Sequence, residues 1–409
     1  MFRYLFLLCI VFALSPLHSE AKIETQVAFT RDGNVWIIEG EREKKITEMG
    51  QYHGPKWSND GSWLLYQQET PSENDNSMIQ NKLWAYKLDT GEKREIFYDG
   101  YNPQWSPIEN TVAFQSEGVL NISNLDKWNN VAVGVYGYTW KPDGKGFLLA
   151  SRATLNPDGW TNPIIYTKSY SGQIENINLF KDVQPLLIIP KEVTVGNGSS
   201  MAVNVGMFKF SPSNKYVSFV LSPTASLSMD SNVLAVSKQN GTSFETIDEI
   251  IFGVGEPKWA PNRDTLAYIS GSGRIVFGFK NKKLKYKEFP VSGTLTPKKY
   301  AELNFTWLDD DTIVTSRIEE KEWSNNFKEH PLPKLIKIKL STNQQTPITN
   351  PPNNRGDYDP MYIGSVKKLI WYRGHSITDK NRDIWISDPN GKNSQLWIKN
   401  ADEITFFEK

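Results

Sequence analysis

Cysteine is almost absent from the 409-residue sequence, and the single one, Cys9, lies in an apolar N-terminal stretch. Residues 1–21 combine the positive charge of Arg3 with an apolar run, and small residues stand at Ser19 and Ala21. This pattern predicts a secretory signal peptide that is cleaved after Ala21. We therefore expect residues 22–409 to contain no disulfide and to be stabilised by a hydrophobic core.

Net charge is also absent, because 46 Lys and Arg residues balance 46 Asp and Glu residues. This balance argues against a nucleic-acid or anionic-membrane partner that is recruited by bulk electrostatics. No apolar run after the leader approaches the roughly 20 residues of a membrane-spanning helix. We expect an exported monomer of the periplasm or the extracellular space, without a transmembrane segment after signal cleavage.

Motifs for hydrolytic and metal chemistry are missing or sparse. The sequence has no Gly-x-Ser-x-Gly nucleophile elbow of the serine-hydrolase type. The acidic groups Asp309–Asp311 and Asp357/Asp359 do not form a complete calcium loop, and we expect their carboxylates to serve turns. Histidine is scarce, and the three that follow the leader are His53, His330 and His375.

A repeated phrase dominates the rest of the sequence. In residues 55–66 an aromatic residue, Trp57, precedes an Asn-Asp-Gly turn at Asn59–Gly61 and a second apolar run. An Asp-Gly turn between two apolar runs is a strong hairpin signal, because these residues tolerate the backbone of tight turns. The aromatic residues that mark the repeats are Trp57, Trp105, Trp140, Phe210, Trp259, Trp307 and Tyr362.

The spacing of these marker aromatics predicts the fold. Successive markers are 48, 35, 70, 49, 48 and 55 residues apart, a period typical of β-propellers. Alternating apolar and polar runs such as Lys82–Tyr98 and Asn232–Ile247 follow the hairpins and predict third and fourth strands. We therefore expect residues 22–409 to form one all-β propeller domain of four-stranded blades, with the marker aromatics in its core.

The two ends of the chain predict how the ring closes. Val27–Thr47 offers three strands without a marker aromatic, and Glu403–Lys409 is a spare strand that can complete them. Such pairing removes exposed sheet edges. The count is then eight blades, with seven possible if one repeat is degenerate. The weakest segment is Asn176–Met201, which we expect to be an extended loop.

The phrase resembles the WSPDG-type repeat of TolB-like propellers, with the best matches at Trp57–Tyr66, Trp105–Phe114, Trp140–Leu149 and Trp259–Tyr268. The resemblance implies a propeller and, by analogy with TolB itself, a protein-binding scaffold of the cell envelope. The α/β domain that precedes the propeller of TolB has no counterpart in this sequence, so the particular partner of TolB is not carried over. Similar repeats form the gating propellers of prolyl oligopeptidase-like enzymes, whose hydrolase domain is also without a counterpart here.

Long polar connections are expected on one face of the propeller. The second-to-third connections are long, whereas the first-to-second turns are short, and a rigid scaffold with one decorated face is typical of a binding surface. Two loop tryptophans, Trp160 and Trp323, are candidate anchors for a partner. The long connections are Glu69–Asn81, Arg152–Asn162, Ser222–Ser231, Arg317–Leu332 and Arg373–Arg382.

Two functions follow from these patterns. The first is a non-catalytic scaffold without a cofactor, which binds a protein or polysaccharide partner of the cell envelope through the long-loop face. The alternative is a metal-assisted lyase or hydrolase that acts on a carbohydrate at the mouth of the central channel. In that alternative His53, His330 and His375 would together hold a divalent transition metal.

Overall fold

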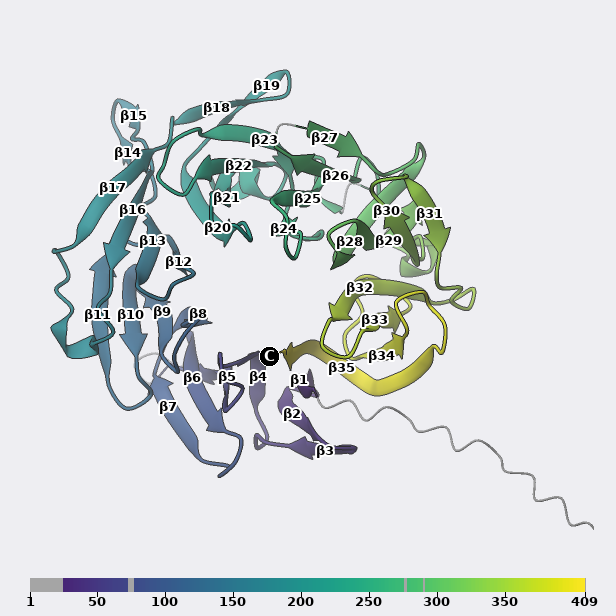
Figure 1. Cartoon of the computed structure of the whole chain (residues 1–409), viewed down its shortest axis with the longest axis horizontal. Coiled ribbons are helices and arrows are strands. Elements are labelled where there is room, and N and C mark those ends of the chain that lie inside the picture. The colour runs from purple at the N-terminus through teal and green to yellow at the C-terminus, as the bar shows by residue number, and fades with distance from the viewer. Residues whose placement is uncertain (1–24, 73–76, 276–277, 290, 409) are drawn as a thin grey trace, which may run out of the picture.

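The computed structural model describes residues 25–72, 77–275, 278–289 and 291–408, so the predicted signal peptide lies outside the described residues. The chain is an all-β propeller of four-stranded antiparallel sheets, which confirms the predicted fold class. Figure 1 shows the sheets placed around a common centre, with one edge strand of each sheet nearest to that centre. Eight blades and a closed ring stay predictions.

Six sheets of the described residues have four strands in sequence order. The first three consist of β4 (Gln51–Trp57), β5 (Trp63–Pro71), β6 (Ile79–Lys87) and β7 (Lys93–Phe97); β8 (Tyr101–Trp105), β9 (Val112–Ser116), β10 (Val119–Ser123) and β11 (Trp128–Val133); and β12 (Gly137–Trp140), β13 (Gly146–Ala150), β16 (Ile164–Ser169) and β17 (Val183–Ile188). The other three consist of β20 (Asn204–Phe210), β21 (Tyr216–Ser222), β22 (Asn232–Lys238) and β23 (Glu245–Ile250); β24 (Lys258–Trp259), β25 (Thr265–Ser270), β26 (Lys283–Glu288) and β27 (Val291–Thr294); and β28 (Tyr300–Asp309), β29 (Thr312–Glu319), β30 (Lys334–Lys339) and β31 (Gln344–Pro347).

A seven-stranded sheet joins the two ends of the chain. Its order is β3-β2-β1-β35-β34-β33-β32. The 13-residue strand β35 lies between β1 and β34 and pairs with both. Residues 395–401 of β35 pair with β34, whereas residues 402–407 pair with β1, as the sequence predicts for the spare C-terminal strand. The strands are β1 (Gln26–Arg31), β2 (Asn34–Glu39), β3 (Arg42–Lys45), β32 (Gly356–Ile363), β33 (Lys368–Gly374), β34 (Arg382–Ser387) and β35 (Gln395–Phe407).

The segment Asn176–Met201 is not the extended loop that the sequence suggests. It supplies β17, the fourth strand of its sheet, and a hairpin of β18 (Glu192–Val195) and β19 (Gly198–Met201). A short helix, η1 (Ile174–Asn176), stands at its start. The prediction was wrong because Val183–Ile188 lacks strict alternation and contains Pro185, which an edge strand tolerates. None of the helices in the described ranges is long and apolar enough to cross a membrane.

The predicted hairpin turn at Asn59–Gly61 forms through a network around Asp60. Its carboxylate accepts hydrogen bonds from Ser58, from the backbone and side chain of Ser62, and from Asn110 of the next hairpin. Although partial burial opposes the effect, these bonds hold the pKa of Asp60 well below its usual range. Gly61 has φ of +71°, and a Cβ atom there would lie 2.6 Å from the side chain of Gln26. Glycine is therefore required at this turn.

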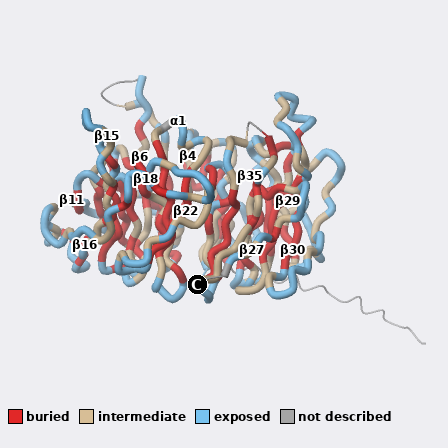
Figure 2. Tube along the Cα trace, turned by 90° about the horizontal axis from the view of Figure 1, so that it is seen from above, coloured by how far each residue is buried: buried red, intermediate tan, exposed pale blue. Residues whose placement is uncertain are grey.

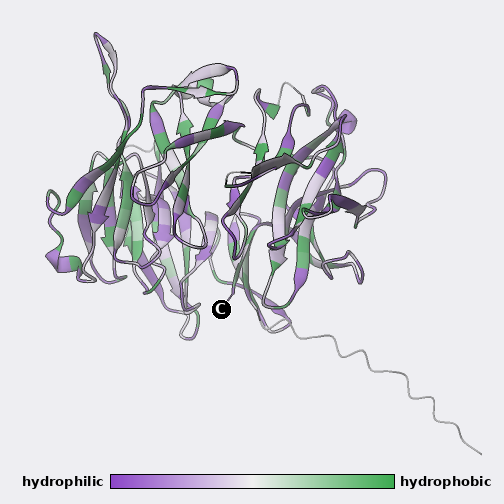
Figure 3. Ribbon diagram, turned by 45° about the horizontal axis from the view of Figure 1, so that its top comes forward, coloured by the Kyte–Doolittle hydropathy of each residue, from purple (hydrophilic) through white to green (hydrophobic). Residues whose placement is uncertain are grey.

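The marker aromatics contribute to the core to different degrees. Trp140 and Trp307 are buried, at 5% and 6% exposure, whereas the other five are half-buried. Trp57, Trp105, Phe210 and Trp259 pack against buried clusters of aliphatic and aromatic residues. Figure 2 shows buried residues along the strands and exposed residues in the connections, and Figure 3 shows hydrophobic and hydrophilic residues following one another along the strands. The core thus lies within and between the sheets.

Four markers also join neighbouring sheets by one recurring hydrogen bond. The indole N–H of each donates to the backbone carbonyl of the residue directly before the marker position of the preceding sheet. The bonds are Trp105 to Lys56 (2.9 Å), Trp140 to Gln104 (3.3 Å), Trp259 to Lys209 (3.0 Å) and Trp307 to Lys258 (3.1 Å). The repeat period therefore places a donor and an acceptor at the same height in successive sheets.

A second bond runs in the opposite direction across the same four boundaries. The side chain directly before the marker donates to a backbone carbonyl of the next inner strand, two residues before its marker. The bonds are Lys56 to Pro103, Gln104 to Tyr138, Lys209 to Pro257 and Lys258 to Phe305. Each boundary is held by two bonds that satisfy buried or half-buried polar groups.

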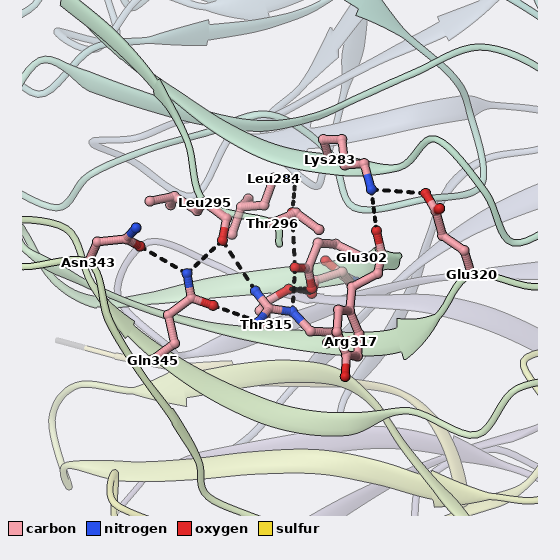
Figure 4. Close-up of polar contacts among 12 residues, drawn as sticks. Lys283, Leu284, Leu295, Thr296, Glu302, Thr315, Arg317, Glu320, Asn343 and Gln345 are labelled. Atoms are coloured by element: carbon pink, nitrogen blue, oxygen red, sulfur yellow. Dashed lines mark hydrogen bonds and ion pairs between the residues drawn. The ribbon is translucent and has the colours of Figure 1, made fainter. Parts of the chain in front are cut away.

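A buried ion pair joins β28 and β29 within the β28–β31 sheet. Glu302 and Arg317 face each other across β28 and β29 at 2.7 Å, with side chains 0% and 5% exposed. Glu302 also accepts from Thr296 and Thr315, and Arg317 donates to Gln345, so both partners are hydrogen-bonded (Figure 4). Burial raises the pKa of Glu302, while Arg317 opposes that effect.

Replacement of Trp105 by Phe tests the indole bond. Trp57 is a matched control, because it is also half-buried but its indole N–H is buried without a hydrogen-bond partner. We expect Trp105→Phe to lower the free energy of unfolding by about 1 kcal/mol more than Trp57→Phe, measured by chemical denaturation. Equal losses in the two variants would mean that the bond contributes nothing.

Removal of one member of the buried ion pair should be costly. We expect Arg317→Met to lower the free energy of unfolding by about 3–5 kcal/mol, because Glu302 is left buried without its cation. The double variant Glu302→Leu/Arg317→Met should recover most of that loss in the same denaturation experiment. A double variant as unstable as Arg317→Met would show that packing, and not the unpaired charge, causes the loss.

Candidate functional site on the long-loop face

The connections that follow the second and the fourth strand of each sheet emerge on one side of the propeller, here called the long-loop face. It carries the hairpin of β14 (Leu155–Asn156) and β15 (Gly159–Trp160), the helix α1 (Ala225–Ser228) and the short helix η3 (Phe327–Glu329). Figure 2 shows β15 and α1 along one side of the molecule and the C-terminus at the other. The opposite side, here the short-turn face, carries the first-to-second and third-to-fourth turns.

Exposed large apolar side chains gather on the long-loop face. Of the seventeen such residues in the described ranges, twelve lie in or directly beside its connections. The twelve are Met49, Met78, Ile79, Tyr98, Tyr101, Val133, Tyr136, Leu155, Leu227, Met229, Phe252 and Phe327. Of the other five, Ile188 and Met201 flank the β18–β19 hairpin, which follows β17 but packs along β23 and is counted apart from the long-loop face. Ile108, Trp128 and Phe180 lie in or beside first-to-second or third-to-fourth connections. Single exposed apolar residues are ordinary, but such a bias toward one face is what an interaction surface produces.

The two candidate tryptophans differ in their surroundings. Trp160 is half-buried at the end of the β14–β15 hairpin, where it lies opposite the exposed Leu155. Trp323 is also half-buried but stacks on the buried Phe279 with ring centroids 5.6 Å apart. Trp160 therefore presents apolar surface next to another exposed apolar residue, whereas Trp323 packs onto Phe279 of the neighbouring β25–β26 connection.

The three candidate histidines each bond to a local partner. His53 on β4 lies 3.2 Å from Asn81, and the exposed His375 lies 2.9 Å from the backbone carbonyl of Asn354. His330 is 5% exposed among aromatic rings and lies 2.7 Å from the carbonyl of Ser324. Within the described ranges, no three His, Cys, Asp or Glu side chains lie together as a metal-binding group.

Of the two acidic groups, one follows the turn prediction and the other does not. Asp309 accepts from the backbone of Asp311 within its turn. Asp357, however, is buried on β32 and pairs with Arg373 at 2.6 Å. Asp359 lies on the same strand, where it accepts from Asn304 and pairs with Arg382 at 3.1 Å. The turn prediction was wrong for Asp357 and Asp359, because their partners lie on other strands: Arg373 on β33, Arg382 on β34 and Asn304 on β28.

A polar pocket of about 270 Å³ opens on the long-loop face beside β32–β35. Arg373 and Arg382, which line it, are paired with Asp357 and Asp359, and Asp379 accepts from backbone N–H groups. Its lining residues are Arg355, Arg373, Gly374, His375, Asp379, Lys380, Asn381, Arg382, Asp383 and Asn400. Most of these charges are therefore already matched within the protein.

A second polar group lies at the centre of the ring, and it was not singled out from the sequence. Lys56, Lys209 and Lys258 each stand directly before a marker aromatic, and Glu256 pairs with Lys209 at 2.6 Å. Burial lowers the pKa of Lys56, and burial together with the charge of Lys209 lowers the pKa of Lys258 to about 8. Burial acts to raise the pKa of Glu256, but the ammonium groups of Lys209, Lys258 and Lys56 outweigh this effect and lower it.

The signal for these lysines was present in the repeated phrase, which reads Pro-Lys-Trp at Pro55–Trp57 and again at Pro257–Trp259, and Phe-Lys-Phe at Phe208–Phe210. The exposed apolar residues of the long-loop face had a weaker signal. Met49 and Phe252 stand between the alternating runs rather than within them.

The lowered pKa of Lys258 predicts a pH-dependent stability. Between pH 8 and its ordinary value of 10.5 the unfolded chain binds more protons than the folded chain, so the free energy of unfolding rises with pH in that window. Below pH 8 both states are protonated and the folded protein bears the full cost of the buried charge. Lys258→Gln should stabilise the protein at pH 7 by about 2 kcal/mol and reduce the rise, as measured by denaturation at several pH values. An unchanged rise would exclude Lys258 as its source.

No family model matches the chain, and no curated protein matches it. Solved structures do match its fold. A crystal structure of the eukaryotic initiation factor is 13% identical and gives a TM-score of 0.58 over 93% of this chain and 87% of that chain. Oligogalacturonate lyase in complex with manganese is 10% identical, with a TM-score of 0.50 over 93% and 85% of the two chains.

A puromycin-hydrolysing peptidase from Mycobacterium tuberculosis is 12% identical, with a TM-score of 0.51 over 86% of this chain and 53% of that chain. The present chain thus spans about half the length of that peptidase. A binding protein and an enzyme are both compatible with such neighbours, because at this level of identity the likeness shows the fold alone.

Proposed function

We propose that this protein is an exported, TolB-like propeller scaffold that binds a protein partner of the cell envelope through the long-loop face and performs no chemistry itself. The observation that carries the proposal is the gathering of twelve exposed large apolar side chains on that face. Three of them are methionines and three are tyrosines, residue types that are enriched in protein interfaces. This composition favours a protein over a polysaccharide as the partner.

Rigid scaffolding and variable connections support the same function. The two reciprocal bonds across neighbouring sheets hold the inner strands. The connections on the long-loop face can therefore differ in length from sheet to sheet without changing the sheets beneath them. In this proposal Trp160 with Leu155 forms one apolar anchor, and Tyr101 and Tyr136 of neighbouring sheets form another. Trp323 supports the β28–β31 sheet and contributes through the position of its loop.

The carbohydrate lyase or hydrolase is less well supported. It rests on His53, His330 and His375, and each of these imidazoles bonds to a partner in its own surroundings. Neither the polar pocket beside β32–β35 nor the central lysine group contains all three of them. The scaffold therefore remains the function that the geometry supports best.

The proposal is tested with the variant Tyr101→Asp/Tyr136→Asp. These tyrosines are 44% and 46% exposed, so the charges should leave the fold intact but oppose docking of an apolar surface. The purified variant and wild type are immobilised and exposed to an envelope extract of the producing cell, and captured proteins are quantified by mass spectrometry. We expect one captured protein to fall at least tenfold with the variant, and a smaller fall with Trp160→Ala.

The matched control carries the same charges on the short-turn face. Ile108→Asp/Asn390→Asp changes exposed residues of a first-to-second and a third-to-fourth turn, and this control should capture the partner as wild type does. Equal capture by the two double variants would contradict the proposal. Capture of acidic or neutral glycans in place of a protein would show that the partner is a polysaccharide and not a protein.

A further inference from the structure

We propose that the centre of the propeller binds a small oxyanion, of the phosphate or polycarboxylate class, against Lys56, Lys209 and Lys258. The site differs from the long-loop face in position and in chemistry, so it goes beyond the scaffold function. It is built from inner strands β4, β20 and β24, which Figure 1 shows facing the centre of the ring.

Equivalent positions of the repeat place the three lysines on inner strands that border one centre. Each stands directly before a marker aromatic, and each reaches a backbone carbonyl of the following inner strand. Lys209 pairs with Glu256 at 2.6 Å, and Glu256 stands two residues before Lys258. Lys56 belongs to β4, which borders the same centre from the opposite side in Figure 1.

Gln104 shows that the bond between sheets does not require a positive charge. Gln104 occupies the same position in β8 and makes the same bond, to the carbonyl of Tyr138 at 3.2 Å. A neutral side chain of similar length thus satisfies the acceptor. Ammonium groups at these positions cost desolvation at Lys56 and Lys258, and repulsion between Lys209 and Lys258, that glutamine would avoid. Because the fold does not require these positive charges, they are available to bind an anionic ligand.

The charges are arranged in two layers along the axis of the ring. The residues directly before the markers, nearer the short-turn face, include three lysines and no acid, whereas acids stand two residues earlier, at Glu256, Asp359 and Glu403. Asp359 is paired with Arg382, and Glu403 accepts from the backbone of Gly54. Glu256 neutralises one lysine at most, so the lysine layer retains positive charge.

Solvent reaches this layer. Lys56 as a whole is exposed, although its ammonium group is half-buried in the bond to Pro103, and the side chains of Lys209 and Glu256 are 33% and 58% exposed. A hollow of about 390 Å³ on the short-turn face is lined by Lys56, Trp57, Ser58, Asn59 and residues 405–408, and it gives a ligand an approach to Lys56 from that side. Each lysine uses one or two of its three donors on the protein, so the remaining donors can bind oxygen atoms of an anion.

The test uses titration calorimetry of the full mature chain at constant ionic strength, with inorganic phosphate in one arm and citrate in the other. We expect one site per chain. The arm with the higher affinity shows whether the site prefers a phosphate or a polycarboxylate. In Lys56→Gln/Lys209→Gln/Lys258→Gln the bonds between sheets are kept, as in Gln104, and affinity should fall at least tenfold. Gln104→Lys, which adds a fourth ammonium group, should raise affinity about threefold or more.

A matched control removes three charges from the outer rim of the short-turn face. Lys93→Gln/Lys127→Gln/Lys392→Gln changes three exposed lysines in or beside third-to-fourth turns and should bind as wild type does. The melting temperature of each variant, measured by circular dichroism, confirms that it folds. Equal affinity of the central variant and wild type, or equal loss in the two triple variants, would overturn the proposal.

Discussion

The pair of hydrogen bonds between neighbouring inner strands is the interaction on which the rest of the structure depends. Apart from the β1–β35 pairing, neighbouring sheets in the described ranges share no backbone ladder, so side-chain bonds and isolated backbone bonds such as Gly255 to Leu303 fix the spacing between them. The indole of Trp105 reaches back to Lys56, and Lys56 reaches forward to Pro103. Because the same two bonds recur at Trp140, Trp259 and Trp307, the sheets keep one height, and the connections they carry are held on a common face.

This arrangement separates two kinds of surface. The long-loop face presents apolar side chains at the ends of strands that are otherwise buried, and the centre presents lysines from the strands that the indole bonds hold. A recurring backbone irregularity of the inner strands contributes to the surface at the centre. Asn102, Met207 and Asp359, three residues before their markers, have positive φ, and register shifts in their strands accompany them. Such bulges redirect side chains toward the centre without breaking the sheet.

Much of the fold could be predicted because its signals are local. The Asn-Asp-Gly turn, the alternation of strands and the period of the markers all depend on neighbouring residues. The pairing of residues 402–407 with β1 could be predicted too, since one end lacked a strand and the other had one to spare. The candidate site was predicted less well. The long connections emerge on one face, as expected, but the exposed apolar residues of that face and the central lysines were not identified, because their exposure depends on which sheets lie beside them.

The sequence by itself determined the repeat, the strand order within each sheet and the face on which the long connections emerge, since each follows from periodicity and turn chemistry within about 50 residues. Only the tertiary structure decided that Trp323 packs on Phe279, that Asp357 is buried against Arg373, and that Lys209 pairs with Glu256. These contacts join residues from different connections, strands or sheets. Their energies depend on burial and on distances across the ring, which no local pattern records.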